Sequence, residues 1–129
     1  MTFPDDLRYT KEHEWIRLEA DGTATIGITA YAQQELGDIV FVELEAPGTE
    51  VEADGTFGTV EAVKTVSELF APVTGTVEAV NDALDGAPET VNQDPYGAGW
   101  MIRLRPANPA DIDALLSADE YRHLIGADA

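Results

Sequence analysis

Short apolar runs separated by turn-forming residues fill most of the sequence, and this pattern restricts the fold more than any other feature. We expect strands at residues 14–19, 23–28, 39–44, 56–63, 67–70, 75–80 and 99–104. Turn-forming pairs lie between most of them, as at residues 21–22, 54–55, 85–86 and 94–95. An Asp-Gly pair favours a tight hairpin because glycine adopts positive φ without strain. Many short strands joined in this way predict a mainly β fold, either a sandwich or a barrel.

Only a few segments have helical signals. A short internal helix is expected at residues 30–36, where Thr29 caps its start and Gly37 ends it in a left-handed conformation. C-terminal helices are expected after Asn108-Pro109 and after Ser117, which forms a capping box with Glu120. We therefore expect a single domain over residues 1–129, with a core at 14–105 and a helical segment at 108–126.

The charge balance excludes several kinds of partner. The net charge is -18 and only seven residues are basic, whereas nucleic acids and anionic membranes select basic surfaces. Two explanations of the acidic surface stay open: partners with positive docking patches, or a salty cytoplasm and the need for solubility. The absence of cysteine excludes disulfides and thiolate metal sites. The sequence contains no long apolar run and no targeting pattern at its start, so we expect a cytoplasmic protein.

A weak internal repeat places one lysine at the centre of the sequence. The segment beginning at Gly37 resembles the one beginning at Gly75, which suggests a barrel with approximate two-fold symmetry. Lys64 lies between the two halves, and Lys11 is the only other lysine. Apolar runs on both sides place Lys64 at a hairpin tip, where its amine is a reachable attachment point for an acyl group. The position of Lys64 between the two apolar runs, taken alone, fits an ordinary solvated turn lysine better than an attachment point.

Four blocks of sequence favour an attachment lysine over an ordinary turn lysine. Their residues resemble those of the H proteins of the glycine cleavage system, and they occur in the same order along the chain. They are YTKEHEW at residues 9–15, GDIVFVEL at 37–44 after IGIT at 26–29, EAVK at 61–64 with APVTG at 71–75, and VNQDPYGAGW at 91–100. The residues beside Lys64 are Val63 and Thr65, whereas biotin carriers usually have methionine at both positions. Lipoyl domains of the 2-oxoacid dehydrogenases lack the His-Glu-Trp hairpin and usually have Asp before the lysine.

The resemblance implies a fold and a function. It implies the barrel-sandwich hybrid of lipoyl domains, with an N-terminal hairpin, one short internal helix and C-terminal helices. It implies a non-catalytic carrier whose lipoate forms an amide with Lys64. This carrier moves the aminomethyl group of glycine from the pyridoxal-phosphate decarboxylase (P protein) to the tetrahydrofolate-dependent aminomethyltransferase (T protein). Dihydrolipoyl dehydrogenase (L protein) then reoxidises it, and a lipoate ligase or lipoyl transferase attaches the group.

The resemblance also implies two further site residues. In this family the loaded arm folds into a cleft of its own carrier, and the cationic amine of the cargo calls for carboxylates there. Glu14 and Glu68 occupy the family's acidic positions, although solvated surface acids are a serious alternative in a chain with 25 acidic residues. Glu35 stands where many members have histidine, so a histidine-specific role at that position is in doubt.

Other functions remain open at this stage. One is a lipoyl donor in a relay to other lipoylated enzymes, and another is an unmodified barrel that acts as an interaction module. A self-sufficient enzyme is the least favoured, since no catalytic constellation, phosphate loop or nucleophile elbow is present. His13 and His123 are too few and too far apart in the sequence to suggest a metal site.

Overall fold

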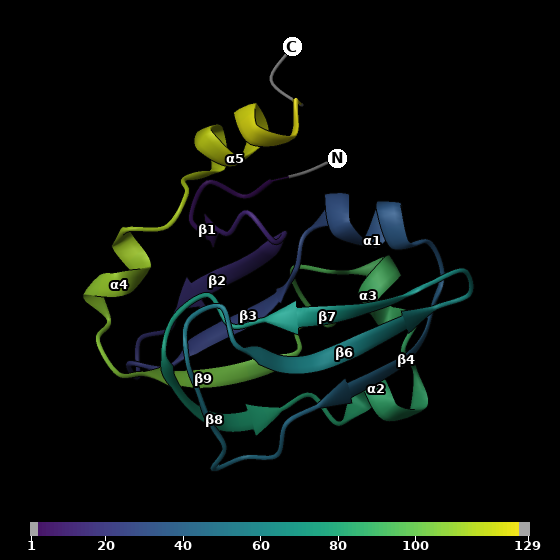
Figure 1. The fold of residues 1–129 in the computed structure, drawn as a ribbon, viewed down its shortest axis with the longest axis horizontal. Coiled ribbons are helices and arrows are strands. Elements are labelled where there is room, and N and C mark those ends of the chain that lie inside the picture. The colour runs from purple at the N-terminus through teal and green to yellow at the C-terminus, as the bar shows by residue number, and fades with distance from the viewer. Residues whose placement is uncertain (1–2, 127–129) are drawn as a thin grey trace.

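The computed structural model describes residues 3–126, which form two antiparallel sheets with short helices around them (Figure 1). The larger sheet has the order β1-β2-β3-β9-β8-β5, comprising Arg8–Tyr9, Glu14–Leu18, Ala24–Ile28, Ile102–Pro106, Gly75–Val80 and Glu50–Val51. The smaller sheet has the order β4-β6-β7, comprising Ile39–Leu44, Thr56–Ala62 and Val66–Phe70. Buried aliphatic residues from both sheets form one core cluster. The mainly β prediction is therefore confirmed.

The first predicted hairpin pairs β2 with β3. The Asp21 carboxylate accepts hydrogen bonds from the backbone N–H and the hydroxyl of Thr23, and Gly22 has φ 90°. Trp15 and Gly27 are directly opposite in this pair, and the buried Trp15 indole donates to the Pro95 carbonyl at 2.9 Å. The ring lies over Gly27 at a distance that leaves no room for a side chain there.

The two halves of the sequence repeat form comparable strand pairs. In the first half β4 pairs with β6, and in the second half β8 pairs with β9. Each pair has a bulge at the corresponding position, between Ile39 and Phe41 in one half and between Val77 and Ala79 in the other. The weak repeat in the sequence thus marks a repeated pair of bulged strands.

The internal helix α1, Ala30–Leu36, has the predicted bounds, and the Thr29 hydroxyl accepts from the Ala32 N–H. Gly37 ends the helix but not in the predicted left-handed helical conformation, because its φ of 81° is combined with an extended ψ of -153°. Two short helices, α2 Ala83–Gly86 and α3 Thr90–Gln93, were not predicted. The last strand begins at Ile102 rather than at residue 99, since the Gly99 N–H closes a turn onto the Asp94 carbonyl.

The C-terminal helices α4, Ala110–Asp113, and α5, Ala118–Ile125, follow the last strand. Ser117 and Glu120 form the predicted capping box, and Gly126 ends α5 in the left-handed conformation. Helix α5 packs beside the N-terminal segment, where Tyr121 stacks on Tyr9 with ring centroids 4.9 Å apart. Within residues 3–126 no helix has the length and apolar character to span a membrane. The single domain over residues 1–129 stays a prediction.

We predict that Gly27→Ala destabilises the protein, because the new methyl group would lie 2.8 Å from the Trp15 indole nitrogen. Overpacking of this kind costs about 1–3 kcal/mol. Gly86→Ala is the matched control, since nothing lies within 4 Å of its Cβ position and the residue is helical. The measurement is urea unfolding of both variants. Equal unfolding midpoints for the two variants would show that the close approach of Trp15 to Gly27 does not make a side chain there destabilising.

Candidate functional site

The structure places Lys64 at the tip of the β6–β7 hairpin, as predicted. The Ala62 N–H donates to the Thr65 carbonyl at 2.8 Å, which leaves Val63 and Lys64 as the tip. Ala62 is buried at the base of this turn, whereas Lys64 is exposed. A rigid two-stranded support therefore holds an amine that another protein can reach.

The hairpin tip lies against the turn that follows α1. The Val63 N–H donates to the Asp38 carbonyl at 3.1 Å. A Cβ atom on Gly37 would lie 3.3 Å from Lys64 Cε and 3.8 Å from Lys64 Nζ, so the lysine side chain extends over this glycine. The φ of 81° at Gly37 already favours glycine, and the close lysine side chain adds a second reason for its presence.

The side chain of Asn92 in α3 forms hydrogen bonds with the same turn. Its side-chain amide donates to the Gly37 carbonyl at 2.8 Å and to Gln33 Oε1 at 2.9 Å. Its carbonyl oxygen accepts from the Ile39 N–H at 2.9 Å. This role of Asn92 was not predicted, because only the fold brings α3 next to the end of α1.

Glu14 and Glu68 line one cleft of about 140 Å³ between α1 and strand β7. The other lining residues are Glu12, His13, Ile28, Ala32, Glu35, Leu36, Val60, Ser67 and Leu69. Leu36 lines the cleft and Gly37, the next residue, contacts Lys64. Both predicted acids therefore line this cleft, although Glu68 also lines a second pocket with Glu43 and Thr59, its neighbours across the strands. The predicted lysine lies over Gly37 and does not line the cleft.

Glu14 is an unusual carboxylate because its side chain is buried, with only 2% of its surface exposed. The Thr10 hydroxyl donates to Oε1 at 2.8 Å, and the Phe70 N–H approaches Oε2 at 3.5 Å. Burial raises the pKa of Glu14 to about 8 from 4.5, and the contacts with Thr10 and Phe70 only partly oppose this. The cleft thus contains a carboxyl group that an approaching cation would help to ionise.

A tight turn brings Thr10 to Glu14. The His13 N–H donates to the Thr10 carbonyl at 3.1 Å, and His13 has φ 73°, which is uncommon for a residue with a side chain. His13 Nδ1 lies 2.7 Å from the Tyr121 hydroxyl, which also lies 2.9 Å from the Thr29 hydroxyl. Helix α5 is thereby linked to the wall of the cleft. The supporting roles of Thr10, Phe70 and Tyr121 were not predicted from the sequence.

The other acids of the cleft differ from Glu14 in their exposure. Glu12, Glu35 and Glu68 are all exposed. The carboxylate of Glu35 is therefore part of the cleft surface. The cleft combines apolar walls with one buried and several solvated carboxylates, an arrangement that suits a cationic group on an apolar stem.

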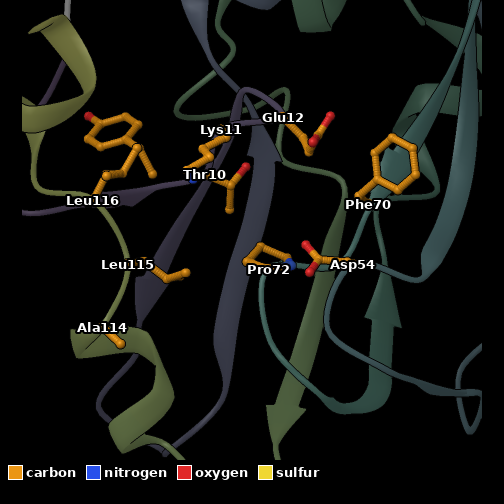
Figure 2. Close-up of a pocket in the computed structure, with 10 residues that line it drawn as sticks. Thr10, Lys11, Glu12, Asp54, Phe70, Pro72, Ala114, Leu115 and Leu116 are labelled. Atoms are coloured by element: carbon orange, nitrogen blue, oxygen red, sulfur yellow. The ribbon is translucent and has the colours of Figure 1, made fainter. Parts of the chain in front are cut away.

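A larger cavity of about 460 Å³ lies beside the Glu14 supports (Figure 2). It is lined by Tyr9, Thr10, Lys11, Glu12, Asp54, Phe70, Pro72, Ala114, Leu115 and Leu116. The C-terminal segment with Ala114 and Leu115 forms the wall that faces Phe70 and Asp54 in Figure 2. Neither Lys64, Glu14 nor Glu68 lines this cavity. We therefore take the smaller cleft as the candidate site.

The raised pKa of Glu14 predicts a specific pH dependence of stability. The folded protein holds a proton up to about pH 8 that the unfolded chain releases above about pH 4.5. The free energy of unfolding should therefore fall as the pH rises between these values, by about 1.4 kcal/mol per unit of pKa shift as an upper limit. Glu14→Gln should flatten this slope in denaturant unfolding measured from pH 4 to 9. Identical slopes for the variant and the wild type would contradict the buried, protonated state.

Comparison with known proteins agrees with this geometry. The sequence profile of the glycine cleavage H-protein family matches residues 7–128. The chain is 62% identical to a glycine cleavage system H protein of Chlorobium chlorochromatii, with 98% of this chain and 99% of the relative covered. The H protein of Salinibacter ruber is 60% identical over 94% of this chain and 97% of its own length.

A solved structure extends the agreement to the fold. The crystal structure of a glycine cleavage system H protein from Mycobacterium marinum has a TM-score of 0.89 and 42% sequence identity. The match covers 96% of this chain and 99% of that one. The predicted barrel-sandwich hybrid is therefore confirmed. The chain belongs to the glycine cleavage H-protein family, whose members are non-catalytic lipoyl carriers that work with the P, T and L proteins.

Proposed function

We propose that Lys64 is the lipoyl attachment residue of this carrier and that Glu14 and Glu68 line the cleft that receives the loaded arm. The observation that supports this most strongly is the position of the lysine. Its amine is exposed at a hairpin tip, and its side chain lies over Gly37, directly after the α1 residue that lines the cleft. Of the two lysines in the sequence, only Lys64 has this position.

The residues of the cleft fit a lipoyl group that carries an amine. Ile28, Leu36 and Val60 offer apolar surface to a hydrocarbon stem, and Glu14 and Glu68 offer carboxyl groups to the amine. When bound, the lipoyl group supplies a disulfide that accepts the aminomethyl group of glycine. The chain itself presents the amine, shields the cargo from water and binds its positive charge.

Glu14 and Glu68 contribute differently to this binding. At pH 7 the carboxyl group of Glu14 holds its proton, because burial disfavours the charged form. A cation in the cleft lowers the pKa of Glu14, and the released proton leaves a carboxylate in contact with the cation. The exposed Glu68, which also lines the cleft, contributes a solvated charge that attracts the cation.

The partners follow from the family and from the attachment chemistry. The P, T and L proteins are the partners of the family. We further propose a lipoate ligase or lipoyl transferase as the enzyme that modifies Lys64, since a covalent amide requires one. The net charge of -18 favours positively charged docking surfaces on these proteins. The cytoplasmic location stays a prediction.

We predict that Lys64→Arg retains the fold but abolishes lipoylation and carrier activity, because arginine cannot form the amide. Lys11→Arg is the matched control, since Lys11 is the only other lysine. Intact mass spectrometry of protein from lipoate-supplied cells should show one lipoyl increment on the wild type and on Lys11→Arg, and none on Lys64→Arg. Glycine–bicarbonate exchange with the P protein should follow the same pattern. A lipoyl increment or exchange activity in Lys64→Arg would refute the assignment.

A further inference from the structure

Four exposed apolar residues surround the Lys64 hairpin tip. Val40 and Phe41 of β4 are 50% and 45% exposed, and Val63 and Val66 of the hairpin are 75% and 61% exposed. We call these four residues the collar. Among residues 3–126 only Leu18 and Leu124 are comparably exposed large apolar side chains. Most of the exposed bulky apolar surface is therefore gathered around one lysine.

Strand pairing shows that the collar residues are neighbours. Phe41 lies opposite Glu61 in the β4–β6 pair, and Glu61 lies opposite Val66 in the β6–β7 pair. Residues in direct register point to the same face of a sheet, so Phe41 and Val66 flank Glu61 on the outer face. The Val63 N–H bonds to the carbonyl of Asp38, which is close in sequence to Val40.

The β4 bulge is responsible for the exposure of Phe41. In regular alternation Ile39 and Phe41 would both face the core. The register shift between them leaves Ile39 buried and turns both Val40 and Phe41 outward. A bulge commonly redirects a side chain in this way. The local backbone thus brings an aromatic ring to the surface beside Lys64.

The other half of the repeat shows that this fold does not require apolar residues at these positions. The β8 bulge has Glu78 and Ala79 where β4 has Val40 and Phe41. Ile39 pairs with Ala62 in the first half, and the corresponding Val77 pairs with Leu104 in the second half. Arg105, which follows Leu104, therefore occupies the position in the second half that Val63 occupies in the first. Glu78 and Arg105 form an ion pair. The half without the lysine therefore fills the positions of Val40 and Val63 with paired charges, and only the half with the lysine exposes apolar side chains.

We propose that the collar is the docking contact for the enzyme that attaches the lipoyl group to Lys64, an inference that rests on the proposed function. In that step the deprotonated Nζ attacks the carbonyl carbon of an activated lipoyl group, either an acyl phosphate or a thioester. The amide C–N bond forms, and the bond to the phosphate oxygen or the thiol sulfur breaks with its electron pair leaving on that group. The amine loses one proton, which passes to the solvent or to the leaving group. The active site must therefore close around the unmodified lysine, and the collar residues are the ones it meets.

The attaching enzyme reacts at the lysine amine itself, whereas the later enzymes act on the distal end of the arm. The exposed acids Asp38, Glu61 and Glu68 lie in the same segments as the collar. The matching surface on the attaching enzyme is therefore an apolar rim flanked by basic residues. Apolar burial should give this contact its affinity, and the acids should give it orientation.

The test compares the unmodified protein with the double variant Val63→Thr/Val66→Thr, which retains side-chain shape and strand propensity but adds hydroxyl groups. Leu18→Thr is the control, because Leu18 is an apolar residue that is 50% exposed at the end of β2 and lies outside the collar. Binding to a lipoate ligase is measured by titration, and lipoylation kinetics by mass spectrometry. Acetylation of Lys64 by a small active ester checks that the reactivity of the amine is unchanged.

We expect the double variant to weaken ligase binding and raise KM about tenfold, with kcat and chemical acetylation retained. Leu18→Thr should behave as the wild type. Equal binding and KM for all three proteins would overturn the collar while leaving Lys64 as the attachment residue. Equal losses of ligase binding in Leu18→Thr would overturn the collar as well. So would normal lipoylation of the double variant followed by impaired glycine–bicarbonate exchange with the P protein. Failure of the wild-type Lys64 to accept lipoate would instead contradict the proposed function.

Discussion

The hydrogen bond from the Val63 N–H to the Asp38 carbonyl fixes the Lys64 hairpin against the end of α1, and the geometry of the site depends on this attachment. This bond extends the pairing of β4 with β6 one residue beyond Ala62, to the tip of the hairpin. Asn92 holds the partner turn through three hydrogen bonds, and Gly37 gives the lysine side chain space to pass. The exposed amine therefore stands on a support that is anchored on both sides.

The cleft relies on a second constraint, which is the burial of a single carboxyl group. Glu14 lies among apolar residues and is held by Thr10 and Phe70, and its raised pKa is the consequence. The other acids of the cleft are exposed and remain solvated. A cation therefore gains little from the outer acids alone, whereas contact with Glu14 occurs in a less polar environment where charges interact strongly. This difference supports the proposal that the cleft binds a charged cargo and excludes water from it.

Much of the fold was predictable from the sequence because turn chemistry is local. The bounds of β4, β8 and α1 agree with the predicted segments, and both the Thr29 cap and the Ser117 capping box form as expected. The exceptions arise where distant segments decide the local structure. Helix α3 and the delayed start of β9 depend on turns around Asp94, and the Gly37 carbonyl accepts a hydrogen bond from the distant Asn92.

The same distinction applies to the site. Lys64 was identifiable because it lies between two apolar runs and within blocks that resemble a family, and Glu14 was identifiable by that resemblance alone. The burial of Glu14 was not predictable, since nothing in its neighbourhood indicates that Phe70, 56 residues away, supplies a backbone N–H to it. The collar around Lys64 likewise required the strand register, because alternation in the sequence places Phe41 on the wrong face.

The most direct test of the account is the pKa of Glu14, measured by carboxyl ¹³C NMR in the unmodified protein and in the protein loaded with the aminomethyl cargo. The account predicts a value of about 8 in the unmodified protein and a clear fall on loading, because the cationic amine stabilises the carboxylate. A value that is the same in both forms would contradict the claim that the arm of Lys64 delivers its cargo to this buried carboxyl group.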